Sequence, residues 1–511
     1  MKRIFSIKHI NCLLWLSLAL TIAGYAYFFT QLSILKYLSF FSFCPDDLAI
    51  SNNILWHSSR GNLFFQSITE SLFDVRFQPF YLVLGLIYKI YPNVVTLFAL
   101  EHLALALGAW PIYLITKRQF GARVVALIFS LSYLTSNLLH QISFVDQKPL
   151  ISFAITFVLF SFYCFEQKKI LPFVLFGLLA MSCRDEASFI ICMFGCYACT
   201  KQMSLRWKIT PVVFGLAYFM CTWLLIMPNL GYSLDNNPYT WNLFTSNQAG
   251  YSFSKRFFIS KHLIYAKKIF ISPLFIFSLF APEVLLIGLP SIIAIQLSVE
   301  KYFVSLESMH HSAFLVPAIF LASVYGLWRI ANWIYRARVI SQRLSRQRLF
   351  TLVSGLFFAY QCLSNFGQNI LLPPGGIERG LEIADHSFIR TRNMYDHIFY
   401  KQEQKDKLAW EFIAFIPEQS SVATTTTYLP ALSARDRIYH FGTVRDIHQR
   451  SGHDLEVDYV FLNKKNDYLG FGGRELRHRQ IIEKIPVLLN SGYIVIKEDK
   501  EFILLKKTIN E

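Results

Sequence analysis

Two short stretches of the sequence place carboxylates where they could do acid–base chemistry. PDDLAIS puts Asp46 and Asp47 side by side after a long apolar run, and CRDEAS puts Asp185 and Glu186 after Arg184, between two shorter apolar runs. A carboxylate can take a proton from a hydroxyl nucleophile or bind a divalent cation, and a guanidinium can bind a phosphate. These five side chains are therefore candidates for one site if the fold brings them together.

Two further segments contribute charged groups. Arg76 lies in DVRFQPF, ahead of an apolar stretch too short to span a bilayer, and SFVDQKPL presents Asp146 and Lys148 directly before another apolar run. The two cations suit a phosphate-bearing substrate. Solvated loop charges are the alternative for Arg76 and Lys148, and a structural ion pair with Asp185 is the alternative for Arg184.

Composition indicates the class of protein that positions these groups. The 511 residues are 54% hydrophobic and 16% charged, with a mean hydropathy of +0.38, which is typical of an integral membrane protein. The formal net charge of +16 could indicate nucleic-acid binding, but the basic residues lie in short loops rather than in one patch. We therefore expect a membrane-lipid environment and no nucleic-acid partner.

The apolar runs predict an all-α polytopic membrane protein with about eleven transmembrane helices. The first run, residues 11–29, is close to the length of a spanning helix and is interpreted as a retained anchor rather than a cleaved signal peptide. The two runs that flank Arg184 predict a hairpin that holds Arg184, Asp185 and Glu186 below the outer surface. One long helix with these charges at mid-membrane is the alternative.

Charge bias predicts the orientation. Lysine and arginine gather in alternate loops, at residues 117–123, 168–169, 201–208 and 329–348, and such loops are cytoplasmic by the positive-inside rule. The same bias favours the hairpin, because a single helix would put the second and third of these clusters on opposite sides. It leaves the N-terminus in the cytoplasm and the chain after Phe366 outside.

The chain changes character near residue 371. Residues 1–371 carry the apolar runs, whereas residues 372–511 predict a small extracytoplasmic α/β domain. Strand candidates in this domain lie at 421–425, 437–441 and 457–462, followed by a final hairpin. We find no phosphate loop, nucleophile elbow or metal-spaced cluster in it, so its predicted role is to cover the membrane site or to bind a partner.

Several segments resemble a known family. In chain order they are DLAISNNILW, RFQPF, EHLALALGAWPIYLITKRQFG, FVDQKP, CRDEASF, LFAPEVLLIGLPSIIAIQLS and HHSAFLVPAIFLASVYGL. They look like successive blocks of the bacterial predicted membrane proteins catalogued as domain of unknown function twenty-seventy-nine, and IPEQSSVATTTTYLPALSARDRIYHFG resembles their outer C-terminal part. That family in turn resembles type-C glycosyltransferases, polytopic enzymes that take a sugar from a polyprenyl-phosphate carrier and use an acid in the first outer loop.

The resemblance implies that Asp47 matches the first-loop acid and that the Arg184 motif matches a Lys-acid-acid motif. The family tends to have histidine at the positions of Arg76 and Lys148, whereas His310 keeps a family histidine before a late helix. The two replacements remove potential imidazole ligands, which weakens the case for a tightly held metal; a changed substrate or lost activity is the alternative. A weakly bound divalent cation held by Asp47 and Asp185 stays an open alternative.

These features together predict an integral glycosyltransferase of the bacterial inner membrane. It would move a sugar from a polyprenyl-phosphate donor to a glycan, lipid or protein acceptor on the extracytoplasmic side. Asp47 is the predicted base with Asp46 as its electrostatic neighbour, and Asp185 and Glu186 are predicted to orient the acceptor or a cation. The predicted substrate-binding residues are Arg76, Lys148, Arg184, Asp146 and His310.

Two other classes of protein compete with this interpretation. A lipid-linked-sugar flippase or transporter would need polar helices lining both leaflets, yet the ionisable groups gather on one side. A non-catalytic assembly factor for envelope glycans would use the outer α/β domain to bind a partner.

The charge bias makes the orientation testable. Fusions to reporters that are active on only one side of the membrane should place Met1 and residues 329–348 in the cytoplasm and Glu511 outside. A cytoplasmic signal from a fusion after Glu511 would contradict this orientation and the outer site with it.

Overall fold

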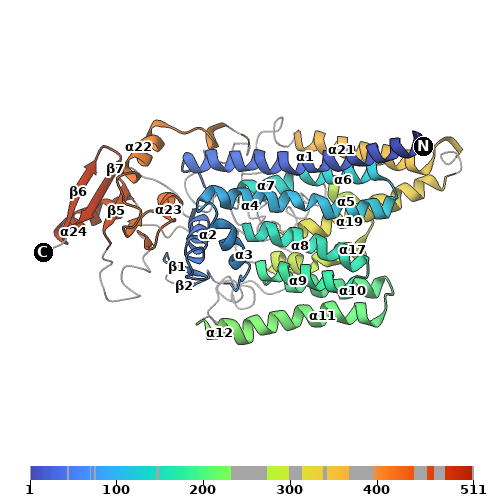
Figure 1. Cartoon of the computed structure of the whole chain (residues 1–511), viewed down its shortest axis with the longest axis horizontal. Coiled ribbons are helices and arrows are strands. Elements are labelled where there is room, and N and C mark those ends of the chain that lie inside the picture. The colour runs from blue at the N-terminus through green and yellow to red at the C-terminus, as the bar shows by residue number, and fades with distance from the viewer. Residues whose placement is uncertain are drawn as a thin grey trace.

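The computed structural model is a long, mostly helical molecule (Figure 1). It describes residues 2–42, 45–68, 71–73, 76–145, 149–231, 273–297, 313–337, 342–366, 395, 397–441, 457–464 and 478–508. A helical bundle forms one end and a small α/β unit forms the other. Between them lie helices α2 (Pro45–Ser58) and α3 (Tyr81–Tyr88), with the short hairpin of β1 (Phe65–Gln66) and β2 (Ser71–Leu72).

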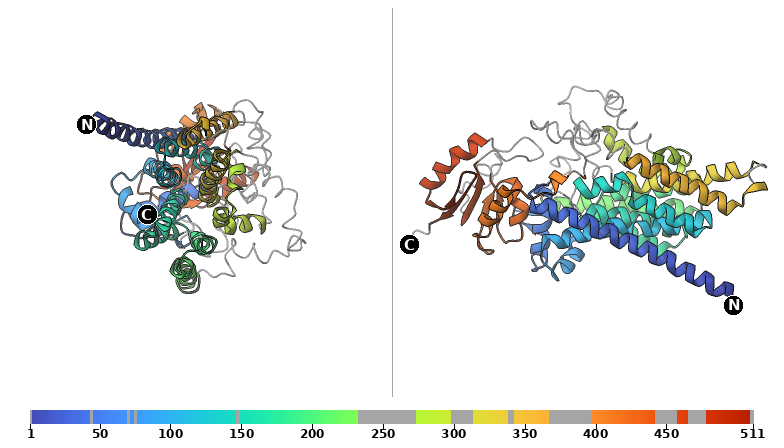
Figure 2. Two further views of the ribbon diagram at one scale, coloured as in Figure 1. Left: turned by 90° about the vertical axis from the view of Figure 1, so that its right-hand side faces the viewer. Right: turned by 90° about the horizontal axis from the view of Figure 1, so that it is seen from above.

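The bundle contains the apolar helices. Its elements are α1 (Lys2–Leu38), α4 (Val94–Leu107), α5 (Ala109–Phe120), α6 (Arg123–Leu134), α7 (Asn137–Val145), α8 (Pro149–Glu166), α9 (Ile170–Cys183), α10 (Ala187–Thr200), α11 (Leu205–Met220), the π-helical turn η1 (Cys221–Ile226), α12 (Met227–Asn229), α16 (Pro273–Ser278), α17 (Pro282–Leu285), η3 (Leu286–Gly288), α18 (Leu289–Leu297), α19 (Leu315–Tyr335) and α21 (Arg346–Phe366). Helix α1 runs obliquely along the bundle, so that its C-terminal end approaches the α/β unit (Figure 2).

Six segments of the described residues are long and apolar enough to cross a bilayer. They are Cys12–Leu38, Val94–Phe120, Arg123–Phe144, Pro149–Glu166, Leu205–Asn229 and Leu315–Tyr335. Three shorter apolar helices cover Ile170–Cys183, Ala187–Thr200 and Pro282–Ala294. The chain is thus built as a multi-pass membrane protein. A total of about eleven spans stays a prediction, and α21 is not among the six segments.

Helices α9 and α10 form the hairpin predicted around Arg184. The chain leaves the helical conformation there, with φ −151° and ψ 118° at Arg184. The rings of Phe165, at the end of α8, and Phe173, near the start of α9, both contact Trp207 near the start of α11. The start of α9 and the end of α10 therefore lie at the same end of the bundle, which excludes one continuous helix.

Two glycines let α10 and α11 approach each other closely. A Cβ added to Gly195 would lie 2.5 Å from the carbonyl oxygen of Lys208, and one added to Gly215 would lie 2.6 Å from the Sγ of Cys192. Both separations are far below van der Waals contact. Small residues at such crossings are the usual means by which membrane helices pack without a hydrophobic driving force.

The α/β unit is a five-stranded mixed sheet with the strand order β4-β3-β5-β7-β6. Its elements are η8 (His397–Phe399), α22 (Gln404–Ile413), β3 (Val422–Thr424), η9 (Thr426–Tyr428), α23 (Leu429–Leu432), β4 (Ile438–His440), β5 (Tyr459–Asn463), α24 (His478–Asn490), β6 (Tyr493–Glu498) and β7 (Phe502–Lys507). Strand β3 pairs in parallel with β4 and β5, and β7 pairs antiparallel with β5 and β6.

This sheet confirms the predicted strands and the final hairpin. Alternate side chains of β5 and β7 enter two apolar clusters, so both faces of the sheet are covered. Phe412 of α22 packs against Phe461 on one face, and Leu488 of α24 packs on the other. Helix α24 was not expected from the sequence. The predicted boundary at residue 371 lies outside the described residues and stays a prediction.

The close approach of α10 and α11 makes a packing prediction. Gly215→Ala should destabilise the purified protein by about 1–3 kcal/mol, because the added methyl must displace both Cys192 and the backbone of Ser188. The control is Gly355→Ala in α21, where a Cβ would meet nothing within 4 Å. Unfolding midpoints in detergent measure both, and equal midpoints for the two variants would contradict the packing account.

Candidate functional site

Asp46 and Asp47 lie in the first turn of helix α2, where sequence reasoning expected an outer loop. Pro45 begins the helix, and both carboxylates are half-buried. Acidic side chains are favourable at this end of a helix because the first backbone N–H groups have no partners within the helix. Proline is also favoured at the first position of a helix, because its fixed φ suits the helix and it lacks an N–H that would go unpaired there. The paired acids are therefore part of a helix start, and their orientation depends on how α2 is held.

Helical geometry puts Asp46 on the side of α2 that faces the α/β unit. Asn53 lies seven residues later, which is roughly 20° from the direction of Asp46. The Nδ2 of Asn53 donates to the carbonyl oxygens of Ser433, at 2.8 Å, and Arg435, at 2.9 Å. Asp46 thus shares the stripe by which α2 contacts the α/β unit.

Asp47 lies on a different stripe, which faces α3. Ser51 follows it by one helical turn, and the hydroxyl of Tyr81 in α3 donates to the Ser51 hydroxyl at 3.1 Å. Ser58 continues this stripe, and a Cβ added to Gly85 of α3 would lie 3.0 Å from its Cβ. The two adjacent carboxylates therefore point toward different neighbours, as expected for successive residues of a helix.

Arg76 pairs with the acids of the α9–α10 turn. Its Nη1 lies 3.4 Å from Asp185 Oδ1 and also donates to the carboxylate of Glu186. The second oxygen of Asp185 accepts a hydrogen bond from Trp223 Nε1 at 2.8 Å. Arg76 and Asp185 are 9% and 3% exposed, so Arg76 is not a solvated loop charge. Asp185 pairs with Arg76 and not with Arg184, so the alternative of a structural Arg184–Asp185 ion pair does not hold.

Arg184 keeps unused hydrogen-bonding capacity. Its Nη2 lies 3.3 Å from Glu186 Oε2, while its Nε is buried and has no hydrogen-bond partner among the described residues. Two arginines thus face two carboxylates, and the four charges sum to zero. A buried guanidinium with a free N–H is costly unless a ligand or water occupies it.

Residues 76–81 connect helix α2, which carries Asp46 and Asp47, to the α9–α10 turn, which carries Asp185 and Glu186. The backbone N–H of Phe80 donates to the Ser182 carbonyl at 3.2 Å, and Gln78 Nε2 donates to the Cys183 carbonyl at 3.1 Å. Tyr81, the next residue, bonds to α2. One short segment therefore contacts the turn that carries Asp185 and the helix that carries Asp47.

The described residues offer no ready ligand set for a metal ion. No three His, Cys, Asp or Glu side chains among them come together as a ligand set. Both oxygens of Asp185 already accept hydrogen bonds, from Arg76 and Trp223. A cation shared by Asp47 and Asp185 would have to displace one of these donors, so we assign no chemistry to a metal. Asp146, Lys148 and His310 lie outside the described residues.

Sequence reasoning missed several members of this site. Trp223 and Gln78 donate directly to the α9–α10 turn, yet a tryptophan near the end of an apolar run is ordinary in membrane helices. Tyr81 was missed because the short helix α3 has no periodic signal long enough to identify its inward face. Asn53 was missed because its segment was expected to be a loop, where asparagine is common.

A second group of buried polar side chains lies inside the bundle. Lys36 is 1% exposed, and Glu101 and His102 are fully buried. Lys36 Nζ donates to the Phe144 carbonyl, and Ser33 Oγ lies 2.9 Å from His102 Nε2. For Glu101 and His102 the signal was available, because ionisable residues within a predicted span are rare and functional by default. They are further candidates for a role in this protein.

The Arg76 ion pair predicts a non-additive effect on stability. Arg76→Met should cost roughly 3–5 kcal/mol, because it leaves the buried carboxylate of Asp185 without its cation. Adding Asp185→Asn should recover part of this loss, since the unpaired charge is then removed. The control is Arg60→Met, an exposed arginine that stacks on Trp56. Unfolding in detergent provides the free energies, and strictly additive losses would contradict the pairing.

Two solved structures resemble the fold at low similarity. An oligosaccharyltransferase from Archaeoglobus fulgidus, in complex with Zn and sulfate, has a TM-score of 0.43 and 12% identity, covering 87% of this chain and 68% of that one. The archaeal oligosaccharyltransferase AglB from Archaeoglobus fulgidus, in complex with an inhibitory peptide and a dolichol-phosphate, has a TM-score of 0.44 and 12% identity, covering 88% and 69%. TM-scores this low do not establish a common fold, and neither structure assigns a role to a residue of this chain.

No curated protein matches the sequence. The family model described as predicted membrane protein DUF2079 matches residues 46–504. The match begins at Asp46 in α2 and ends within β7, so it includes the helical bundle and the α/β unit. The chain therefore belongs to the predicted membrane protein family DUF2079.

Proposed function

We propose that this protein is an integral membrane glycosyltransferase. It takes a sugar from a polyprenyl-phosphate-linked donor and transfers it to a glycan, lipid or protein acceptor on the extracytoplasmic side. The observation that carries the proposal is the bridge made by residues 76–81, which contact both α2 and the α9–α10 turn. This bridge associates a first-loop acid with an arginine–carboxylate cluster, as the resemblance to type-C glycosyltransferases requires.

Asp47 is the proposed general base. Its carboxylate takes the proton of the acceptor hydroxyl while that oxygen forms a bond to the anomeric carbon of the sugar. The bond from the anomeric carbon to the phosphate oxygen breaks, and polyprenyl phosphate leaves with the electron pair. Asp46 faces the α/β unit and contributes mainly to the local field.

Arg184 is the proposed phosphate ligand. Its buried Nε has no partner among the described residues, so an oxygen of the donor phosphate would satisfy it. Arg76 holds the two acids of the turn and supports the arrangement from the side of the first outer loop. Lys148, Asp146 and His310 stay predicted substrate-binding residues.

The acids of the α9–α10 turn would then orient the acceptor. Glu186 is 40% exposed at its side chain, whereas Asp185 is buried and fully hydrogen-bonded. Glu186 is therefore better placed to accept a hydrogen bond from an acceptor hydroxyl, and Asp185 is better placed to hold Arg76. This division refines the equal roles that the sequence suggested for the two residues.

The base assignment predicts a large and specific loss of transfer. Asp47→Asn should lower sugar release about 10²- to 10⁴-fold, because the amide cannot accept the hydroxyl proton. Asp46→Asn is the matched control and should cost less. The assay uses membranes containing each variant with polyprenyl-phosphate donors that carry radiolabelled glucose, mannose or galactose, and it follows label leaving the carrier lipid.

Other outcomes separate the competing functions. Label that crosses the membrane while attached to its carrier would indicate a flippase. Wild-type transfer by Asp47→Asn, or a loss that only follows lower protein accumulation, would refute the role of Asp47. A wild-type protein that neither releases nor moves label would favour an assembly factor.

A further inference from the structure

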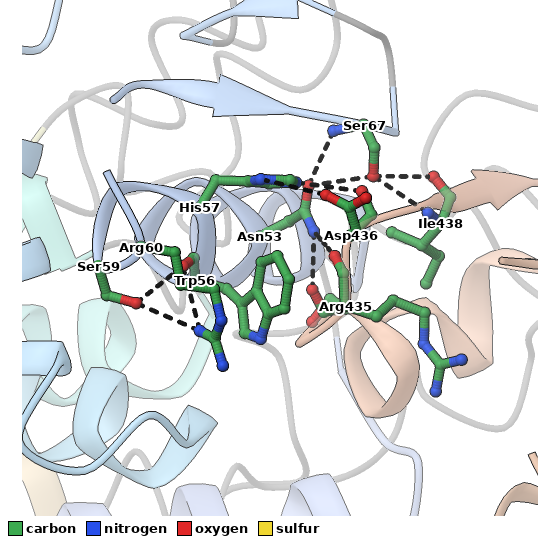
Figure 3. A network of polar contacts seen from close by, with 10 residues as sticks. Asn53, Trp56, His57, Ser59, Arg60, Ser67, Arg435, Asp436 and Ile438 are labelled. Atoms are coloured by element: carbon green, nitrogen blue, oxygen red, sulfur yellow. Dashed lines mark hydrogen bonds and ion pairs between the residues drawn. The ribbon is translucent and has the colours of Figure 1, made fainter. Parts of the chain in front are cut away.

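The contact between α2 and the α/β unit is a network of buried polar groups (Figure 3). It joins residues of α2 to the segment between α23 and β4, and it includes Ser67 from the hairpin that follows α2. No residue of this network was predicted to have a role. Its position matters because the same helix carries Asp46 and Asp47 in its first turn.

Asn53 is the centre of the network. Its side chain is fully buried, and both ends of its amide are used. Nδ2 donates to the carbonyls of Ser433 and Arg435, and Oδ1 accepts from the backbone N–H of Ser67 at 2.8 Å and its hydroxyl at 3.3 Å. The hydroxyl of Ser67 in turn accepts from the backbone N–H of Ile438 in β4 at 3.0 Å. Only an amide supplies these two donors and one acceptor at this place.

Two neighbours of Asn53 extend the contact along α2. Asn52 donates to Ser433 Oγ at 2.8 Å and accepts from the Tyr88 hydroxyl of α3 at 2.8 Å. In the last turn, His57 Nε2 lies 3.2 Å from the Asp436 carbonyl. Burial lowers the pKa of His57, although the Asp436 carboxylate opposes this, so the imidazole is neutral at neutral pH and donates through Nε2. Helix α2 is thus held from the α/β unit and from α3 at once.

The α/β unit also holds the chain before α2. Trp410 Nε1 donates to the Leu38 carbonyl at 3.0 Å, and Ser39 Oγ donates to the Phe399 carbonyl at 3.2 Å. Phe40 stacks on Trp410 with ring centroids 4.8 Å apart. The α/β unit therefore contacts the chain both before Asp46 and Asp47, at residues 38–40, and after them, in α2.

Adjacent acids make the rotation of α2 critical. Successive residues of a helix differ in direction by roughly 100°, so a rotation of that size would put Asp46 where Asp47 was. Asn53 shares the direction of Asp46, and its four hydrogen bonds allow one rotation only. We infer that Asn53 is a positioning residue by which the α/β unit sets the rotation of α2 and selects Asp47 over Asp46 at the site. The catalytic consequence rests on the proposed function.

The test separates the rotation of α2 from sugar transfer. Hydrogen exchange of full-length Asn53→Ala should be about tenfold or more faster over residues 45–58, with α9 and α11 unchanged, because the buried partners of the amide lose their hydrogen bonds. Ser67→Ala, which removes only one partner, is the milder variant if Asn53→Ala fails to fold. Asn229→Ala is the matched control, because Asn229 is exposed and donates to the Leu225 carbonyl one turn earlier. Unchanged exchange over α2 in both Asn53→Ala and Ser67→Ala would overturn the inference.

Kinetic measurements then distinguish a positioning role of Asn53 from a purely structural one. Asn53→Ala should lower the kcat for sugar release about tenfold to a hundredfold with little change in the KM of the donor. Its residual activity should become sensitive to Asp46→Asn, which a purely structural role would not produce. Equal sensitivity to Asp46→Asn with and without Asn53 would overturn the selection of Asp47. If wild-type protein releases no sugar while α2 still loosens in Asn53→Ala, the proposed function fails and the positioning of α2 by the α/β unit stands.

Discussion

The ion pairs of Arg76 with Asp185 and Glu186 constrain the end of the bundle that lies toward the α/β unit. A carboxylate as buried as Asp185 must be paired, because a lone charge removed from water costs several kcal/mol. Its cation comes from a segment more than a hundred residues away in sequence, at 3.4 Å. The pairing therefore fixes the segment before α3 against the α9–α10 turn. Helix α9 ends just before Arg184, and the backbone N–H of Phe80 bonds to Ser182 in its last turn. Both features bring the two segments together at this contact.

The ion pair of Arg76 with Asp185 also determines where α3 and α2 lie. Because residues 76–80 are held against α9, α3 must begin beside the bundle, and Tyr81 then reaches Ser51 of α2. Helix α2 packs between α3 and the α/β unit, and Asp47 and Asp46 lie on the stripes of α2 whose later residues contact α3 and the α/β unit, respectively. The α/β unit is thus packed against the candidate site rather than a separate module, which agrees with a family match that includes both parts.

Much of the architecture could be predicted from the sequence because it depends on local patterns. The apolar runs, the hairpin at Arg184 and the strands of the α/β unit follow from hydrophobic length, charge bias and alternation. The partner of Asp185 could not be predicted, since Arg184 is adjacent in sequence while Arg76 is near only in space. Asp46 and Asp47 were placed in a loop because α2, which is polar on several sides, lacks the periodicity of a helix at a surface.

The site residues differ in how far the sequence could identify them. Ionisable groups flanked by apolar runs are conspicuous, and Arg184, Asp185 and Glu186 were found for that reason. Glu101 and His102 carry the same signal and were overlooked within a longer apolar segment. Asn53 and Trp223 carry none, because their importance comes from hydrogen bonds that only the folded chain makes.

The central claim is that a lipid-linked phosphate and the carboxylate of Asp47 meet at the outer end of the bundle. A structure of the protein bound to a non-hydrolysable polyprenyl-phosphate sugar analogue tests it most directly. The account predicts the phosphate within hydrogen-bond distance of Arg184 Nε, with the anomeric carbon on the side of Asp47. A phosphate bound instead at the opposite end of the bundle, near Lys117 and Arg118, would contradict the account.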